Sequence, residues 1–404
     1  MSRLSDRLKG AITRDEAETH DEFLQPYGMG RNPFPPARTV WPEVLYNQEV
    51  AVDRLGDIGL ELANSGPLRR SLGILGGTGV GKTHFLRHAQ MAFADLFSAK
   101  GLRFGIVEFQ VGSGKIQDLV RSIYSSCDEG VRRLGDEDLI TSVANSDQLS
   151  SEVLNDVSLQ DVRVALTRLQ DAHAGRSSKQ SYEQLREEFK RWIHGATITD
   201  AERKHLGVFG RIATGSMSVR VATELFRVAY RLGRLHGVFI CLDEIETLWS
   251  GGHKVMQVQS FLQDLRFLFD EALKGEEGYS LCIIAASTTT GARSFRQVNQ
   301  AMFQRLGFEE SARVELQPIG SAKAAEEFAR EYIEAELKRW SDRTRRKGTT
   351  RELLTKNEII HIYETLVPQR PRVQSRLGGT GEGDVSQAAL LDSLHRAVEA
   401  KRSD

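Results

Sequence analysis

The sequence predicts an α/β protein in which helices flank a parallel sheet, with a helical insert and a C-terminal helical lid. Three observations predict this fold. Short apolar runs of the kind found in buried strands alternate with helical patterns, an order that favours a parallel sheet. A long, mostly helical stretch at about 127–236 separates two of these runs, and from about residue 320 onward the pattern is helical.

Four apolar runs are expected to form strands of the sheet: 71–75, 102–109, 237–242 and 281–286. Helical periodicity is expected in the segments between them, at about 47–64, 84–90, 115–126 and 256–273. We therefore expect an N-terminal arm and linker over 1–46, a core over 47–319 that contains the insert, and a lid over 320–404.

A complete phosphate-binding pattern, GGTGVGKT, directly follows the first apolar run at residues 76–83. Glycines let successive backbone N–H groups point at phosphate oxygens, and the helix that follows adds a partial positive charge. The lysine of the pattern reaches the β- and γ-phosphates, and its last hydroxyl holds Mg²⁺. The sequence thus predicts an ATP–Mg²⁺ site lined by Gly76, Gly77, Thr78, Gly79, Val80, Gly81, Lys82, Thr83 and His84.

An acidic pair, Asp243-Glu244, ends the third apolar run. Parallel strands present their carboxyl ends at one edge of the sheet, so this pair is expected beside the phosphate loop. Asp243 is predicted to hold Mg²⁺, as the Walker B aspartate does, and Glu244 to act as the general base on the attacking water. These roles predict hydrolysis in addition to binding.

Two further polar residues are candidates for the same reaction. Thr288, or its neighbour Ser287, ends the fourth apolar run and is expected to sense the γ-phosphate; ordinary strand-end polarity is the alternative. Arg305 lies between apolar residues and is expected to act in trans on a neighbouring subunit's nucleotide. A surface salt bridge is the alternative for Arg305.

These segments, 71–90, 237–248, 281–290 and 301–318, together resemble the AAA+ ATPases, matching Walker A, Walker B, sensor 1 and the arginine-finger region in that order. The resemblance is to the initiator-like branch, related to origin-recognition and STAND ATPases. It implies that Asn32, Pro33 and Phe34 form a linker on the adenine side of the nucleotide. It also implies a sensor-2 arginine in the lid, for which Arg370 and Arg372 are candidates.

The insert narrows the resemblance. Residues 189–195, followed by Ile198-Thr199 and Leu206-Gly207-Val208, are similar to the insert of ATP-binding proteins from BREX-type phage-exclusion cassettes, as is the ending Leu242 to Glu246. This resemblance implies a homo-oligomer with effector proteins of the same cassette as partners.

A basic segment in the predicted lid provides a candidate surface for double-stranded DNA, with Trp340 expected to meet a base or sugar. A solvated helix end is the alternative. The cations are Lys338, Arg339, Arg343, Arg345, Arg346 and Lys347.

Three classes of function follow: a DNA-associated ATPase serving an effector in defence, a protein-directed nucleotide switch, and a small-molecule kinase. The Asp243-Glu244 pair disfavours the kinase, because it suits water activation. Transposition and replication are alternatives to defence.

Bulk composition sets further limits. The net charge of −1 over 404 residues means that any nucleic-acid surface must be a local patch. The three cysteines, Cys127, Cys241 and Cys282, show no metal-ligand spacing, so we expect buried, reduced thiols in a cytoplasmic protein. The N-terminus is polar, and the sequence has no run of 18 apolar residues. We therefore expect no secretory leader and no membrane span.

Overall fold

The computed structural model describes residues 22–36, 39, 41, 44–176, 181–274, 277–344, 351–367 and 385–403. These residues belong to two compact units, one drawn from 1–48, 77–84 and 317–404 and the other from 49–76 and 85–316. The second unit holds the sheet and the insert. The first holds the phosphate loop and the C-terminal helices.

The sheet has five strands in the order β2-β3-β6-β1-β7, and every neighbouring pair is parallel. The predicted α/β fold with a parallel sheet is therefore confirmed, and β1, the strand before the phosphate-binding motif, lies inside the sheet between β6 and β7. The sequence does not predict the short β7 or the small antiparallel pair β4–β5. The strands are β1 (Arg69–Leu75), β2 (Phe104–Gln110), β3 (Gly237–Asp243), β4 (Leu273–Lys274), β5 (Glu277–Gly278), β6 (Ser280–Ser287) and β7 (Val314–Glu315).

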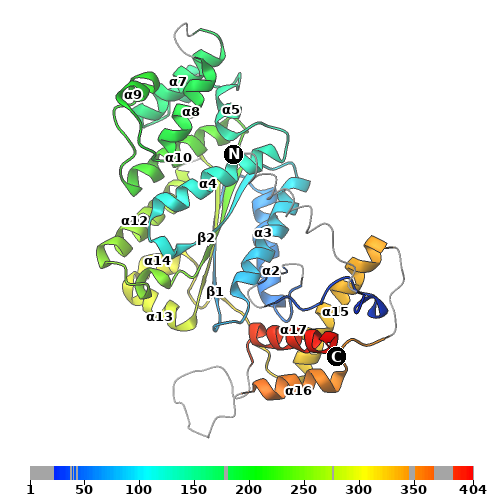
Figure 1. Ribbon diagram of the computed structural model, residues 1–404. Coiled ribbons are helices and arrows are strands. Elements are labelled where there is room, and N and C mark those ends of the chain that lie inside the picture. The colour runs from blue at the N-terminus through cyan, green and yellow to red at the C-terminus, as the bar shows by residue number, and fades with distance from the viewer. Residues whose placement is uncertain are drawn as a thin grey trace. The chain divides into compact units, whose positions relative to one another are not determined.

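Helices cover both faces of the sheet because side chains along a strand alternate between faces. Phe104 of β2 stacks on Phe97 of α3 (Lys82–Ala99), with ring centroids 3.8 Å apart. Its neighbour Gly105 faces α4 (Ile116–Arg132), where a Cβ would lie 2.5 Å from Cys127 Sγ. The helix α2 (Glu49–Asn64) lies with α3 on one side, while α12 (Val255–Glu271) lies on the other (Figure 1).

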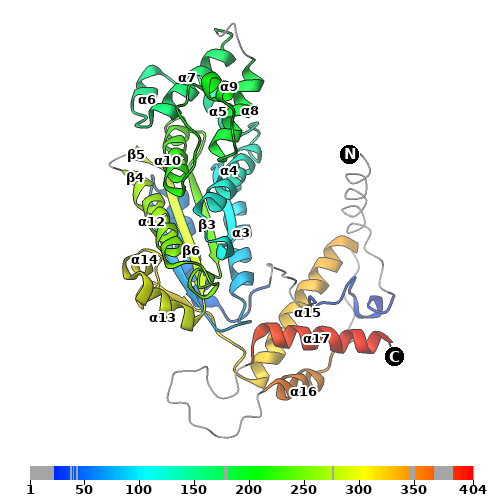
Figure 2. The same cartoon turned by 60° about the vertical axis from the view of Figure 1, so that its left-hand side comes forward.

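The predicted insert is helical and lies between two adjacent strands, β2 and β3. Its small helices gather beyond the end of the sheet in both views (Figures 1 and 2). Its fully buried aromatic side chains, Phe189, Trp192 and Phe226, join the same hydrophobic core as the sheet. The helices are α5 (Leu139–Ala144), α6 (Ser151–Asn155), α7 (Gln160–His173), α8 (Tyr182–Ile193), α9 (Asp200–Leu206) and α10 (Gly215–Arg231).

Three short helices follow the carboxyl ends of β3 and β6: α11 (Thr247–Ser250), α13 (Thr289–Val298) and α14 (Gln300–Arg305). Trp249 of α11 stacks on Phe295 of α13, with centroids 5.0 Å apart. Phe295 in turn contacts Phe303 of α14 at 5.9 Å. We call α13 and α14 together the α13–α14 arm.

The other unit packs α15 (Ala322–Thr344), α16 (Lys356–Leu366) and α17 (Gln387–Ser403) around a separate hydrophobic core. The N-terminal segment, including the short helix η1 (Gln25–Tyr27), completes this core. Phe34 is fully buried beside Tyr332 of α15. A Cβ on Gly30 would lie 2.3 Å from the Trp340 ring, so only glycine permits this approach.

The three cysteines are free and buried, as predicted. Burial raises the pKa of each thiol well above its usual range. Within the described ranges, no helix has both the length and the apolar character needed to cross a bilayer.

Candidate functional site

The phosphate loop is formed in a conformation that its glycines make possible. Gly79 and Gly81 have φ values of 76° and 100°, which side chains disfavour. The Lys82 ammonium donates a hydrogen bond to the Gly77 carbonyl oxygen at 3.0 Å, across the loop. Gly77 and Thr78 are exposed, while Val80 is buried. The backbone thus has the open turn that an anion requires, and the residues fit a triphosphate.

The start of α17 lies against this loop within the same unit. The Ala388 N–H donates to the Gly79 carbonyl oxygen at 3.0 Å, and a Cβ on Gly79 would lie 3.0 Å from Ser386 Oγ. A Cβ on Gly81 would lie 3.0 Å from Gln387 Oε1. The lid residues at the loop are therefore Ser386 and Gln387, which the sequence did not single out. The predicted Arg370 and Arg372 lie outside the described residues.

The predicted adenine-side linker is bound to α17. The Asn32 side-chain amide donates to the His395 carbonyl oxygen at 3.2 Å and to Glu399 at 2.9 Å. The Phe34 ring is fully buried, and its carbonyl oxygen contacts His395 Nδ1 at 2.8 Å. These contacts explain Asn32-Pro33-Phe34 as an anchor for the N-terminal segment. An adenine contact by this segment stays a prediction.

The acidic turn begins where β3 ends. Asp243 is the last residue of β3 and is 1% exposed, and its Oδ1 accepts the Glu244 N–H at 2.9 Å. Glu244 is exposed and has φ 52°; Asn47 is the other non-glycine residue in the described chain with positive φ. A strained backbone conformation persists only where the surrounding structure maintains it, and such conformations cluster at functional sites. Here the strained residue is Glu244, the predicted base, which is exposed directly after the buried end of β3.

The register of the sheet brings the parts of the site to one edge. Leu75, which precedes Gly76 of the phosphate loop, pairs with Ser287 at the end of β6. Asp243 ends β3, the strand on the other side of β6. The start of the loop, the acidic turn and Thr288 therefore leave the sheet at the same edge.

Thr288 begins α13. Its hydroxyl oxygen accepts the Gly291 N–H at 3.0 Å, and its own N–H donates to Glu246 Oε1 at 3.1 Å. The hydroxyl proton is still available for donation, since the hydroxyl acts only as an acceptor in this cap. Glu246 was not predicted, although the sequence Asp243-Glu244-Ile245-Glu246 carries a third acidic residue in the turn.

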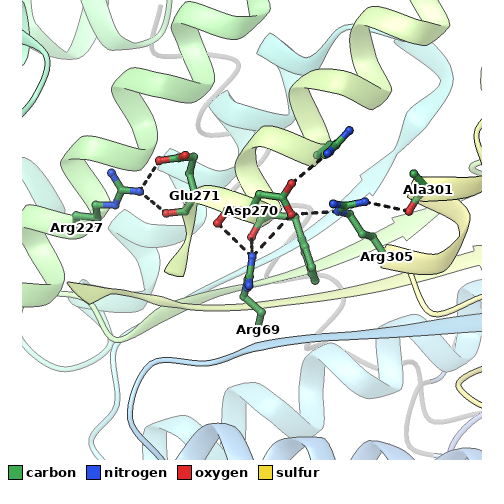
Figure 3. Close-up of polar contacts among 8 residues, drawn as sticks. Arg69, Arg227, Asp270, Glu271, Ala301 and Arg305 are labelled. Carbon is green, nitrogen blue, oxygen red and sulfur yellow. Dashed lines mark hydrogen bonds and ion pairs between the residues drawn. The ribbon is translucent and has the colours of Figure 1, made fainter. Parts of the chain in front are cut away.

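Arg305 lies away from this edge. It donates from Nε to Asp270 Oδ1 at 3.1 Å and from Nη1 to the Ala301 carbonyl oxygen at 3.4 Å. Arg69, the first residue of β1, also reaches Asp270, at 3.8 Å, from the amino end of the strand (Figure 3). Arg266 pairs with the other oxygen of Asp270 at 3.3 Å. The sheet thus separates Arg305 from its own chain's acidic turn, and Asp270 is a partner that the sequence did not reveal.

The basic segment is only partly described. Lys338 and Arg343 are exposed on α15, whereas Arg339 donates to Glu336 at 2.8 Å and 2.9 Å. The expectation that Trp340 meets a base is wrong, because the residue is only 7% exposed and its ring lies against Gly30. Arg345, Arg346 and Lys347 lie outside the described residues.

Comparison with known proteins identifies the family. A family model described as BREX system ATP-binding protein BrxC/D matches residues 111–339, more than half of the chain. The chain belongs to this BrxC/D family. The match covers the insert, the acidic turn, the α13–α14 arm and most of α15, which agrees with the resemblance found in the sequence. The phosphate loop precedes the matched residues, so its assignment depends on its own motif and geometry.

Three solved structures similar to this BrxC/D chain each share 12% sequence identity with it. The ORC2 protein of Aeropyrum pernix, in ADPNP and ADP complexes, has a TM-score of 0.41 over 75% of this chain and 55% of its own. Cdc6p from Pyrobaculum aerophilum has a TM-score of 0.40 over 91% of this chain and 65% of its own. The Aeropyrum pernix ORC1 protein, solved in complex with DNA, scores 0.36 over 89% and 66%.

This BrxC/D chain therefore spans between 55% and 66% of the length of these three structures. No curated protein matches it in sequence.

Proposed function

We propose that this BrxC/D chain is a cytoplasmic AAA+ ATPase that hydrolyses ATP with Mg²⁺, assembles into an oligomer on double-stranded DNA, and serves an effector of its cassette in phage defence. The observation that carries the proposal is the register of the sheet: Leu75 before the phosphate motif, Ser287 before Thr288, and Asp243 lie at the carboxyl ends of β1, β6 and β3, which are consecutive in the sheet. Family membership supports the nucleotide and the link to defence.

Each residue has a part in the proposed reaction. The backbone of residues 76–84 and Lys82 bind the phosphates, and Thr83 with Asp243 would hold Mg²⁺, which supplies charge neutralisation when bound. Glu244 accepts the proton of the attacking water. Thr288 orients that water through its hydroxyl, and Arg305 of a neighbouring subunit stabilises charge on the transferring phosphoryl group.

A shared site explains why Arg305 lies apart from its own acidic turn. In an oligomer, the face that carries Arg305 meets the phosphate-loop edge of the next subunit. ATP would then join subunits and hydrolysis would release them.

The test is ATP hydrolysis by the purified full chain, with and without duplex DNA, across a salt series, with the assembly state followed in the same samples. We expect salt-sensitive stimulation by DNA, because phosphate contacts weaken as salt rises. Lys82→Ala should abolish ATP binding. Glu244→Gln should retain binding and lower turnover roughly 10²- to 10⁴-fold, the range of general acid–base catalysis.

A protein-directed switch is the second candidate. It is favoured by Phe209, which is 74% exposed on the insert, and by the burial of Trp340 in the segment proposed for DNA. Reversal of the exposed charges Lys338 and Arg343 separates the two functions. DNA affinity should fall while nucleotide affinity stays unchanged; hydrolysis that is indifferent to DNA at every salt concentration would favour the switch.

A further inference from the structure

Glu246 connects the acidic turn to the next strand of the sheet. Its Oε1 accepts the Thr288 N–H at 3.1 Å, at the first turn of α13, where a helix favours negative charge. Its Oε2 is buried and has no hydrogen-bond partner in the part of the chain that the structure describes. A half-satisfied buried carboxylate is costly. A neutral side chain at position 246 would avoid this desolvation cost, so the presence of a carboxylate there indicates a function.

The packing around Glu246 is close enough to transmit a shift. A Cβ on Gly291 would lie 2.7 Å from Glu246 Cβ, 2.7 Å from Ser287 Oγ and 2.9 Å from Thr288 Oγ1. Only glycine therefore allows α13 to approach the turn this closely. Ile245, the residue before Glu246, is fully buried and donates its N–H to the Ala286 carbonyl oxygen of β6 at 3.4 Å.

A second connection runs parallel to this one. Trp249, three residues after Glu246, stacks on Phe295 with an interplanar angle of 14°. Phe295 and Phe303 lie edge to face, and Phe303 is two residues before Arg305. The turn that carries Glu244 and the arm that carries Arg305 are thus joined by one polar and one aromatic contact. Because packed cores do not deform continuously, a move of the turn moves the arm.

We propose that Glu246 is a positioning residue that couples the acidic turn of one subunit to the α13–α14 arm, and so to the Arg305 that this subunit presents to its neighbour. The inference rests on the proposed function. In this arrangement the Glu246 carboxylate fixes the positions of both Thr288 and Arg305. The nucleotide bound to one subunit therefore controls how well that subunit's Arg305 is placed in the active site of its neighbour.

The experiment mixes subunits. An Arg305→Ala chain keeps its acidic turn but cannot donate the arginine, and a Glu244→Gln chain donates the arginine but lacks the base. Each alone should turn over ATP slowly, and the mixture should recover turnover. We expect recovery to fall roughly 10-fold or more when Glu246→Ala is added to the Glu244→Gln chain, since small misplacements of a catalytic group are that costly.

Further variants separate a loss of coupling from a loss of folding. Glu246→Gln keeps an oxygen for the Thr288 N–H and should lose less recovery than Glu246→Ala. Gly291→Ala displaces Glu246 from the opposite side and should also reduce recovery. Glu310→Gln, an exposed glutamate beyond the arm, is the matched control and should retain recovery in full. ATP affinity, measured with a fluorescent analogue, should stay within about twofold in all of them, because none of these residues belongs to the phosphate loop.

The outcomes are distinct. Full recovery by chains with Glu246→Ala and with Gly291→Ala would overturn the coupling. An active natural chain whose mixed variants show no recovery would overturn the trans-acting Arg305 and this inference with it, while leaving hydrolysis intact. A natural chain that does not hydrolyse ATP under any condition would overturn the proposed function itself. A role of Glu246 confined to its own subunit's site would leave recovery unchanged, since that subunit already lacks its base.

Discussion

Asp270 forms an ion pair with Arg305, the residue that we propose acts on the nucleotide of a neighbouring subunit, so Asp270→Asn should make this BrxC/D chain more active. The carboxylate pairs with Arg305 at 3.1 Å, Arg266 at 3.3 Å and Arg69 at 3.8 Å. The Arg305 side chain is 29% exposed and that of Asp270 is 36% exposed. Solvent therefore screens the attraction, and the pair belongs with surface ion pairs.

The magnitude follows from that exposure. Pairs of this kind contribute about 0.2–1 kcal/mol, and Asp270 divides its charge among three arginines. Loss of the charge should therefore free Arg305 by about 0.2–0.5 kcal/mol, the lower part of that range. Because 1.4 kcal/mol is a factor of ten, the expected gain in turnover is roughly 1.5- to 2-fold.

The assay is ATP turnover against protein concentration for the natural chain and for Asp270→Asn. Asp53→Asn, an exposed aspartate on α2, provides the control for the change in net charge. The half-saturating protein concentration should fall or the plateau should rise for Asp270→Asn alone. A lower turnover in a folded Asp270→Asn protein would refute the reasoning, because it would mean that Asp270 places Arg305 for catalysis.

Three further outcomes are expected. Gly130→Ala should lower the free energy of unfolding by about 1–3 kcal/mol in urea, because its Cβ would lie 2.2 Å from the Phe104 carbonyl oxygen and would push α4 from β2. Burial and the charge of Arg103 lower the pKa of His236, so its contribution to stability is present at neutral pH and should be lost as pH falls below about 6.5; His236→Asn should flatten the pH dependence of Tm. Asn32→Ala should lower Tm by releasing the N-terminal segment from α17, whereas an unchanged Tm would mean that the Asn32 contacts are not maintained in solution.

Local sequence patterns predict much of this structure. The strands β1, β2, β3 and β6 follow from apolar runs, and α12 follows from its periodicity with ends within two residues of the expected 256–273. The phosphate loop and the acidic turn were found because their function requires fixed residue types at fixed spacing. Asp243 and Glu244 could therefore be located without knowledge of the strand order.

What the sequence did not reveal depends on partners distant in the chain. Asp270 has no motif, and its role is set by Arg69, 201 residues away, and by Arg305, 35 residues away. Trp340 was assigned to a surface because its neighbours are basic, but Gly30 from the N-terminal segment supplies the cavity that buries it. Short elements such as β7 were missed because two residues carry no periodicity.

The adjacency of β2 and β3 has a mechanical consequence. The insert leaves the sheet at the end of β2 and returns at the start of β3, and these strands are paired in parallel over all seven residues, from Phe104 with Gly237 to Gln110 with Asp243. A pull that separates the two attachment points would slide one strand along the other, so the paired hydrogen bonds would share the load in shear. That load would reach Asp243, the last residue of β3, along a single stretch of extended backbone. A partner that binds and pulls on the insert would thereby exert tension on Asp243, the residue that we propose holds Mg²⁺.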